Sequence, residues 1–167
     1  MAGEGNHDKA LEEFSELLEM KKKHVYLVPT LFAGYWVNRM ADTFPPNIAE
    51  KARAAAAHIL LTFQHAVRIG VPIALGTDAA VEPHGMNARE FSLMASNGFT
   101  PAQALLAGTA GGADLLGLAD RIGTLQAGKD ADIVAVAGNP LASIDATEHP
   151  VFVMKQGVVY VRGAAGH

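Results

Sequence analysis

Asp78 is the residue whose type and position point most directly to chemistry. It follows an apolar run at residues 71–75, which is bounded by Gly70 and Gly76, in the sequence Gly76-Thr77-Asp78. A run without polar residues is typical of a strand covered on both faces of a parallel sheet. Ligands of parallel α/β folds gather at the carboxyl ends of such strands. Asp78 is therefore either a reacting carboxylate at a sheet edge or an ordinary cap of the following turn.

Histidine and carboxylate side chains are the metal ligands that this chain offers, because it contains no cysteine. The seven histidines stand at positions 7, 24, 58, 65, 84, 149 and 167. His58 and His65 fall on one side of an expected helix. Two imidazoles without a carboxylate or an open coordination position do not define a metal site, and we expect none there.

The elements expected around Asp78 alternate between helix and strand. They are predicted as a helix at residues 8–23, a buried strand at 24–28, a helix at 48–69 and a buried strand at 71–75. Asn47 and Glu50 form a pattern like a capping box at the start of the long helix, and Gly70 predicts its left-handed end. Tyr35 and Trp36 are expected in an aromatic loop, which packs against the fold rather than covering a substrate.

The second half of the chain changes from helical to strand-like patterning. Asn87 and Glu90 predict a capped helix over residues 88–97, and Thr100 with Gln103 predicts a capping box for the next helix. Strands are then expected at residues 131–136, 151–154 and 158–161, the last two joined in a hairpin by Gln156-Gly157.

Composition limits the classes of partner. The chain has 167 residues, of which 50% are hydrophobic, so it has the material for a core. Its formal charge of −4, without a basic stripe, argues against a nucleic-acid partner. No apolar run approaches the roughly 20 residues of a membrane helix, and no signal-peptide pattern opens the chain. We therefore expect a cytoplasmic protein that uses neither nucleic acid nor membrane.

Several motifs occur in the order that one enzyme family uses. They are Gly76-Thr77-Asp78, Pro83-His84-Gly85, Asn87-Ala88-Arg89-Glu90, and the segments at residues 98–105, 120–136 and 153–160. By these motifs the chain resembles the amidohydrolase superfamily over about residues 25–163. Within it, the chain is similar to the branch of imidazolonepropionase-related and prolidase-like enzymes, which includes Xaa-Pro dipeptidase and arginine carboxypeptidase.

The resemblance implies an α/β fold in two parts. Residues 1–118 would supply the last two βα units of a TIM-type (β/α)8 barrel. Residues 119–167 would supply part of the small β-sandwich that accompanies the barrel. In this scheme the segment at residues 24–30 is the seventh barrel strand with its Val-Pro-Thr ending, and Thr30 lies on the rim of the active site.

The chemistry implied by the resemblance is hydrolysis of a carbon–nitrogen bond by metal-activated water, with zinc as the usual ion. Asp78 matches the aspartate that binds the metal and moves the proton of the water. His84, Thr30 and Arg89 are then expected at the substrate, where an imidazole and a guanidinium suit a carboxylate. Arg89 has a second interpretation, an ordinary structural ion pair.

The other metal ligands of the family are missing from this sequence. No His-x-His pair exists, and no histidine matches the ligands of the middle strands. We therefore expect an incomplete C-terminal portion of an amidohydrolase, inactive alone, whose partner is the missing N-terminal part of the barrel or a second copy. One half of a split enzyme and a non-catalytic half-barrel scaffold are the alternatives. The substrate is expected to be a small or dipeptide-like molecule, and the sequence leaves open peptides with a C-terminal proline or basic residue, N-acyl amino acids and cyclic imides.

Overall fold

The computed structural model describes residues 4–163, with side chains from Lys9 onward. These residues pack as two compact units, one ending at Glu82 and the other beginning at Pro83. The first unit contains α1 (Glu4–Lys22), α2 (Leu31–Arg39), the 3-10 helix η1 (Ala41–Thr43) and α3 (Pro46–Ile69). The boundary expected after residue 118 separates the parts of the chain that resemble the barrel and the β-sandwich, whereas these units are defined by contacts within the chain. That boundary stays a prediction.

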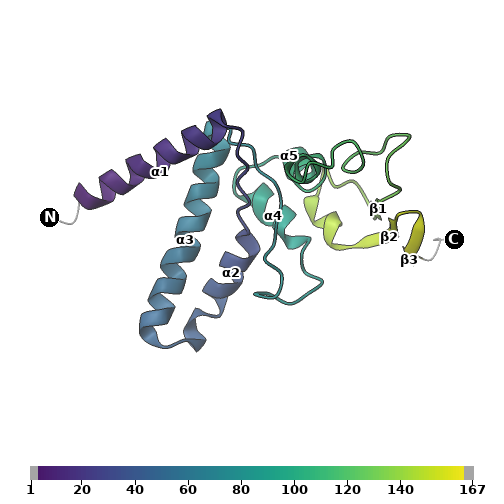
Figure 1. Ribbon diagram of the computed structural model, residues 1–167. Coiled ribbons are helices and arrows are strands. Elements are labelled where there is room, and N and C mark those ends of the chain that lie inside the picture. Colours follow the sequence, from purple (N-terminus) through teal and green to yellow (C-terminus); the bar gives the residue numbers. More distant parts are fainter. Residues whose placement is uncertain (1–3, 164–167) are drawn as a thin grey trace. The chain divides into compact units, whose positions relative to one another are not determined.

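The core of the first unit lies where α2 packs beside α3 (Figure 1). Phe32 of α2 and Phe63 of α3 are buried almost completely, at 1% and 0% exposure. The helix α1 also contacts α3, and Lys21 donates a 2.6 Å hydrogen bond to the carbonyl oxygen of Ile69. A cation at a helix C-terminus stabilises the helix, so Lys21 joins the ends of α1 and α3.

The two expected strands of the first unit are present only as extended segments. Leu27 and Ile73 form a single parallel bridge, and the structure assigns no strand at residues 24–28 or 71–75. Burial also differs between the two segments, because Val71 and Ile73 are buried whereas Val25 is 47% exposed. Parallel sheets occur almost only where both faces are covered and several strands lie together, and the described part of the first unit contains no further strand.

Two further local expectations are wrong. Tyr35 and Trp36 lie in α2 rather than in a loop, and both rings contact Phe32, with centroids 6.1 Å apart. The helix α3 begins at Pro46 with no side-chain cap, so Asn47 and Glu50 do not form a capping box. Proline at the first helical position needs no amide hydrogen bond, and this explains the earlier start. Gly70 ends α3 at φ 80°, as predicted.

The second unit begins with three short helices, α4 (Arg89–Ser96), α5 (Pro101–Ala107) and α6 (Ala110–Leu115). The capping box of α5 is confirmed, since Thr100 accepts a hydrogen bond from the amide of Gln103, whose side chain accepts one from the amide of Thr100. The expected cap of α4 is wrong. Its N-cap is Ala88, which makes no side-chain hydrogen bond.

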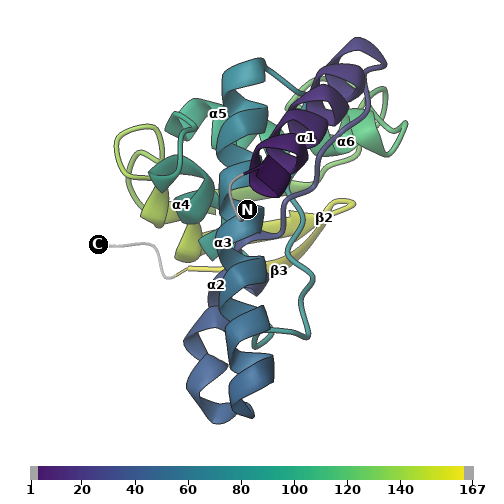
Figure 2. The ribbon, with the colours of Figure 1, turned by 90° about the vertical axis from the view of Figure 1, so that its left-hand side faces the viewer.

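A three-stranded antiparallel sheet follows, with strand order β1-β2-β3. Its strands are β1 (Ile133–Val136), β2 (Pro150–Lys155) and β3 (Val158–Arg162), with the 3-10 helix η2 (Ile144–Glu148) before β2. Figure 2 shows β2 and β3 side by side, and Val153 pairs with Val161. Positive φ values at Gln156 and Gly157 give the predicted two-residue hairpin turn.

Helices and a small antiparallel sheet therefore make up an α/β part of a domain, as expected. Among the described residues, no helix combines the length and apolarity that crossing a membrane requires.

Candidate functional site

The candidate site lies where the two bridged segments of the first unit end. The amide of Leu27 donates to the carbonyl oxygen of Pro72 at 2.9 Å, and the amide of Ala74 donates to that of Leu27 at 3.1 Å. Because the segments run parallel, their following residues emerge on the same side of the bridge. Thr30 follows one segment, and Asp78 follows the other.

Gly76 makes the approach of the two segments possible. A Cβ atom at this position would lie 2.4 Å from Cγ1 of Val28 and 3.9 Å from Cγ2 of Thr30. The first distance is shorter than a van der Waals contact, so only a glycine fits without movement of Val28. The structure therefore brings Thr30 beside Gly76, two residues before Asp78, and the place of Thr30 on the rim of an active site stays a prediction.

Both residues at these ends adopt an unfavourable backbone conformation. Thr30 has φ 47° and ψ 51°, and Asp78 has φ 56°. A left-handed conformation is uncommon for a residue with a Cβ atom and is unusual for a β-branched one such as Thr30. Strain of this kind clusters at active sites and ligand clamps, at about 1–3 kcal/mol for each residue. Such a conformation also occurs in turns, as at Gln156, so the backbone supports the site at Thr30 and Asp78 only together with the position of the two residues at the ends of the bridged segments.

Asp78 is exposed, and its carboxylate makes no hydrogen bond or ion pair with the residues that the structure describes. Its carbonyl oxygen, not its side chain, accepts a hydrogen bond from the amide of Val81. The side chain of Asp78 therefore does not cap the turn. A carboxylate held in a strained position with all its acceptor sites free is suited to a ligand, a metal ion or a water molecule.

Glu82 is a residue that the sequence reasoning missed. Its side chain is 2% exposed, and within the described part of the chain neither carboxylate oxygen has a hydrogen-bond partner. A buried polar group without a hydrogen-bond partner lowers the stability of a fold. The only hint in the sequence is an acidic residue in a loop with few polar neighbours. We call residues 77–82 the Asp78 loop.

His84 and Arg89 belong to the second unit. His84 is exposed and makes no hydrogen bond with the described residues. Nε of Arg89 lies 3.2 Å from a carboxylate oxygen of Glu148, so the guanidinium forms the ion pair that was its alternative interpretation. Arg89 remains half exposed in this ion pair. Its contact with a substrate stays a prediction.

The contact between α4 and η2 gathers further polar groups around Arg89. The hydroxyl of Ser92 donates to Asp145 at 2.7 Å and lies 3.3 Å from a carboxylate oxygen of Glu148. We call Arg89, Ser92, Asp145 and Glu148 the α4–η2 joint. Its charges are engaged within the unit, and this favours a structural role for the joint.

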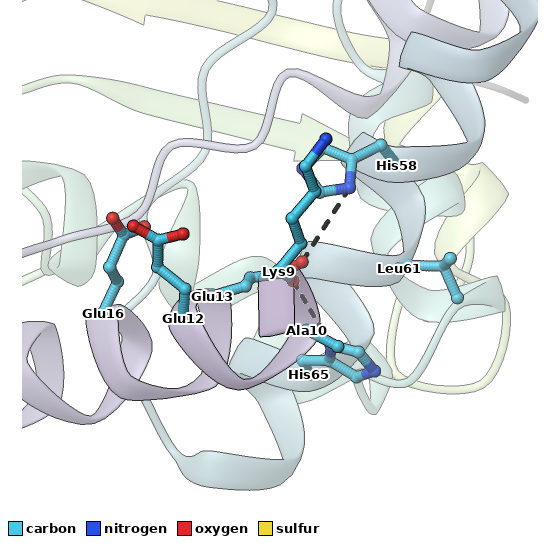
Figure 3. Close-up of a pocket in the computed structure, with 8 residues that line it drawn as sticks. All are labelled: Lys9, Ala10, Glu12, Glu13, Glu16, His58, Leu61 and His65. Atoms are coloured by element: carbon cyan, nitrogen blue, oxygen red, sulfur yellow. Dashed lines mark hydrogen bonds and ion pairs between the residues drawn. The ribbon is translucent and has the colours of Figure 1, made fainter. Parts of the chain in front are cut away.

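A groove of about 660 Å³ lies between α1 and α3 (Figure 3). In it Glu13 accepts a hydrogen bond from Thr62 at 3.0 Å and lies 3.3 Å from Nδ1 of His65 and 3.8 Å from Nδ1 of His58. Figure 3 shows both imidazoles turned toward this one carboxylate. The groove lies on helices of the first unit and contains none of the predicted site residues.

The residues present do not by themselves fit a metal ion. Over residues 9–163, whose side chains are described, no three histidine, aspartate or glutamate side chains come together as metal ligands. A metal centre needs three or more protein ligands, and Asp78 offers one carboxylate. We therefore derive no catalytic step through a metal from this chain.

A sequence profile of the amidohydrolase family matches residues 5–161. The chain belongs to the amidohydrolase family. Among amidohydrolases of known structure, a Xaa-Pro dipeptidase crystallised with methionine in its active site is similar, at 38% identity and a TM-score of 0.81. The match covers 85% of this chain and 36% of the dipeptidase.

An ochratoxinase of Aspergillus niger is a second relative of this amidohydrolase chain, 38% identical over 102 residues that make up 60% of this chain and 21% of the ochratoxinase. The crystal structure of A. niger ochratoxinase superimposes with a TM-score of 0.70 at 30% identity, covering 87% of this chain and 34% of the other. The crystal structure of an amidohydrolase from Thermotoga maritima MSB8 superimposes with a TM-score of 0.64 at 27% identity. This match covers 90% of this chain and 35% of the other. The chain therefore spans about a third or less of its relatives.

Proposed function

We propose that this chain is the C-terminal portion of an amidohydrolase that hydrolyses a carbon–nitrogen bond with an activated water molecule. Membership of the family supports the reaction class. The observation that carries the proposal is the exposed Asp78, whose carboxylate has no partner among the described residues, on the segment whose Gly76 lies against Thr30 just past a parallel bridge. In the barrel proposed here, the two bridged segments correspond to the last two strands, whose carboxyl ends would form the site.

In this proposal Asp78 is the catalytic base. Its carboxylate takes a proton from the attacking water and delivers it to the leaving nitrogen. Thr30 and His84 contact the substrate, and Arg89 joins them only if a ligand carboxylate competes with Glu148. A divalent ion, zinc by the family resemblance, would be held by Asp78 together with ligands that lie outside this sequence.

The proposed substrates are small molecules with an amide or related bond, and dipeptides are the first to test. Two of the similar structures are described as a Xaa-Pro dipeptidase with bound methionine and a prolidase complexed with N-methylphosphonate-L-proline. The second of these supports only the fold, at 22% identity.

Exposed apolar side chains support a missing partner. Leu11, Phe14 and Leu18 on α1 are 57%, 45% and 50% exposed, and Tyr160 on β3 is 69% exposed. Apolar groups gathered on one helix mark an interaction surface. We propose the remaining part of the barrel as the partner, with a second copy of the chain as the alternative. Light scattering on the purified chain distinguishes a monomer from a dimer.

Zinc content tests whether the chain is incomplete. The chain is dialysed against zinc and then against buffer, and its metal is measured by plasma mass spectrometry. We expect close to no bound zinc, because a single carboxylate holds the ion weakly. One zinc ion retained by each chain would contradict the proposal and would mean that this sequence completes a site.

Asp78→Asn tests the catalytic role once the remaining barrel is supplied. The substitution removes the proton acceptor while keeping the size of the side chain, so we expect turnover to fall by about 10³-fold. The circular-dichroism spectrum should not change. Asp120→Asn, at another exposed position, is the control and should keep full activity. Equal activity of the two variants would exclude Asp78 as the base.

A further inference from the structure

Three unfavourable features meet at residues 78–82 of the Asp78 loop. The backbone φ is 56° at Asp78 and 130° at Ala80, and the carboxylate of Glu82 is buried without a partner among the described residues. Each of these costs free energy. Natural sequences tolerate such local conflicts mainly at functional sites. The loop is therefore held in a conformation that stability alone does not favour.

Comparison with Glu90 shows that a buried carboxylate in this chain need not lack a partner, as Glu82 does. Glu90 is 0% exposed, yet it has an interaction partner within the structure. Glu82 is 2% exposed and has none that the described residues supply. A carboxylate accepts hydrogen bonds at two oxygens, so Glu82 retains its full capacity for a cationic partner.

The chemistry around Glu82 favours a nitrogen cation over a metal ion. A protein metal site needs several ligands together, and the described side chains contain no such group. An ammonium group needs only one carboxylate, with which it makes strong, charge-assisted hydrogen bonds. The loop also follows a parallel-bridged segment, at the end where ligands of α/β folds bind.

We infer that Glu82 recognises a free ammonium group of the substrate. The inference rests on the proposed function and narrows it to dipeptide-like substrates with a free amino terminus, since N-acyl amino acids and cyclic imides carry no such cation. The carboxylate oxygens are covered in this conformation, so the inference requires the loop to turn Glu82 outward when the ligand binds.

Thermal unfolding of the chain tests the state of Glu82 without any ligand. Glu82→Gln keeps the size of the side chain and replaces a buried carboxyl group that has no partner among the described residues by a neutral amide, so the midpoint should rise by about 2–4 °C. Glu90→Gln is the matched control at a buried, partnered position, and it should lower the midpoint. An unchanged or lower midpoint for Glu82→Gln would overturn the inference, because the carboxyl group of Glu82 would then not be a destabilising group in the free chain.

A pair of ligands that differ in one charge tests recognition. L-methionyl-L-proline and its N-acetyl derivative are added to the chain at equal millimolar concentration. We expect the free dipeptide to raise the midpoint by about 2 °C more than the acetylated one. In Glu82→Gln the two compounds should act alike. Equal shifts or no shift in the wild-type chain, or a difference that persists in the variant, would overturn the inference.

Release of proline, measured in the completed enzyme, keeps this test separate from the proposed function. Suppose that neither compound is hydrolysed, but that the free dipeptide raises the unfolding midpoint more than the acetylated one and that this difference is lost in Glu82→Gln. The proposed reaction then fails and the inference holds. If both compounds are hydrolysed with equal kcat/KM, the reaction holds and Glu82 does not select the ammonium group.

Discussion

In the α4–η2 joint the charged side chains have partners, whereas in the Asp78 loop the two carboxylates have none among the described residues. Arg89 of α4 pairs with Glu148 of η2, and Ser92 of α4 donates a hydrogen bond to Asp145 of η2. Asp78 and Glu82 make no comparable contact with any residue that the structure describes. Both regions are short and polar, so composition alone does not separate them.

The difference teaches which polar groups to regard as structural. Groups that satisfy one another, as in the joint, contribute modestly to the free energy of unfolding and leave little capacity for a ligand. Groups left without partners by the fold are retained at a cost in stability. Substitutions in the two regions should therefore change stability in different directions, which Ser92→Ala and Ala80→Gly test. Gly76→Ala tests the close approach of the bridged segments that lead into the Asp78 loop.

Gly76→Ala should give the largest loss of stability. The added Cβ atom would lie 2.4 Å from Cγ1 of Val28, so the bridged segments must separate. We expect a decrease of about 2 kcal/mol in the free energy of unfolding, measured by urea denaturation.

The double variant Gly76→Ala/Val28→Ala removes the clashing methyl group, and it should be no less stable than Val28→Ala alone. Gly112→Ala in α6 is the control, because its nearest neighbour lies 3.6 Å away, and a helical alanine should raise stability slightly. If Gly76→Ala also raised stability, the close approach of the segments would be excluded.

Ser92→Ala should weaken the joint to a smaller extent. It removes the hydroxyl that donates to Asp145 at 2.7 Å, and hydrogen bonds to charged groups contribute more than neutral ones. We expect a decrease of about 1.5 kcal/mol by urea denaturation. Ser96→Ala, at an exposed position of the same helix, should change stability by less than about 0.5 kcal/mol. Equal effects of Ser92→Ala and Ser96→Ala would mean that the hydrogen bond of Ser92 contributes nothing to the free energy of unfolding.

Ala80→Gly should have the smallest effect, and it should be stabilising. Glycine adopts the φ of 130° at Ala80 without steric cost, which offsets the greater entropy of the unfolded chain. We expect an increase of about 0.5 kcal/mol. Ala79→Gly, at a neighbouring position with negative φ, should instead lower stability. A loss in both variants would show that the loop is not strained.

Local sequence signals predicted much of the helical and hairpin structure. Gly70 ends α3, Thr100 and Gln103 cap α5, and Gln156-Gly157 turns the hairpin. These outcomes depend on a few neighbouring residues. The strand expected at residues 24–28 depends instead on long-range neighbours, which the described residues do not supply, and only one bridge forms.

The candidate site was accessible from sequence in part. Asp78 is predicted because a strand-like run precedes it, and Thr30 is predicted through the family resemblance; both roles stay predictions. Glu82 was missed because the lack of a partner is a property of packing, which no local pattern encodes. The pairing of Arg89 with Glu148 likewise joins residues far apart in the chain, so sequence left two interpretations open.

The Leu27–Ile73 bridge also has a consequence for the order of folding. The β2–β3 hairpin closes over a two-residue turn, and hairpins of this kind form within about 1–10 μs. The bridge instead joins segments separated by α2 and α3, so it pays a larger loop-closure entropy until both helices are formed. We therefore expect Thr30 and Asp78 to come together late in the folding of their unit.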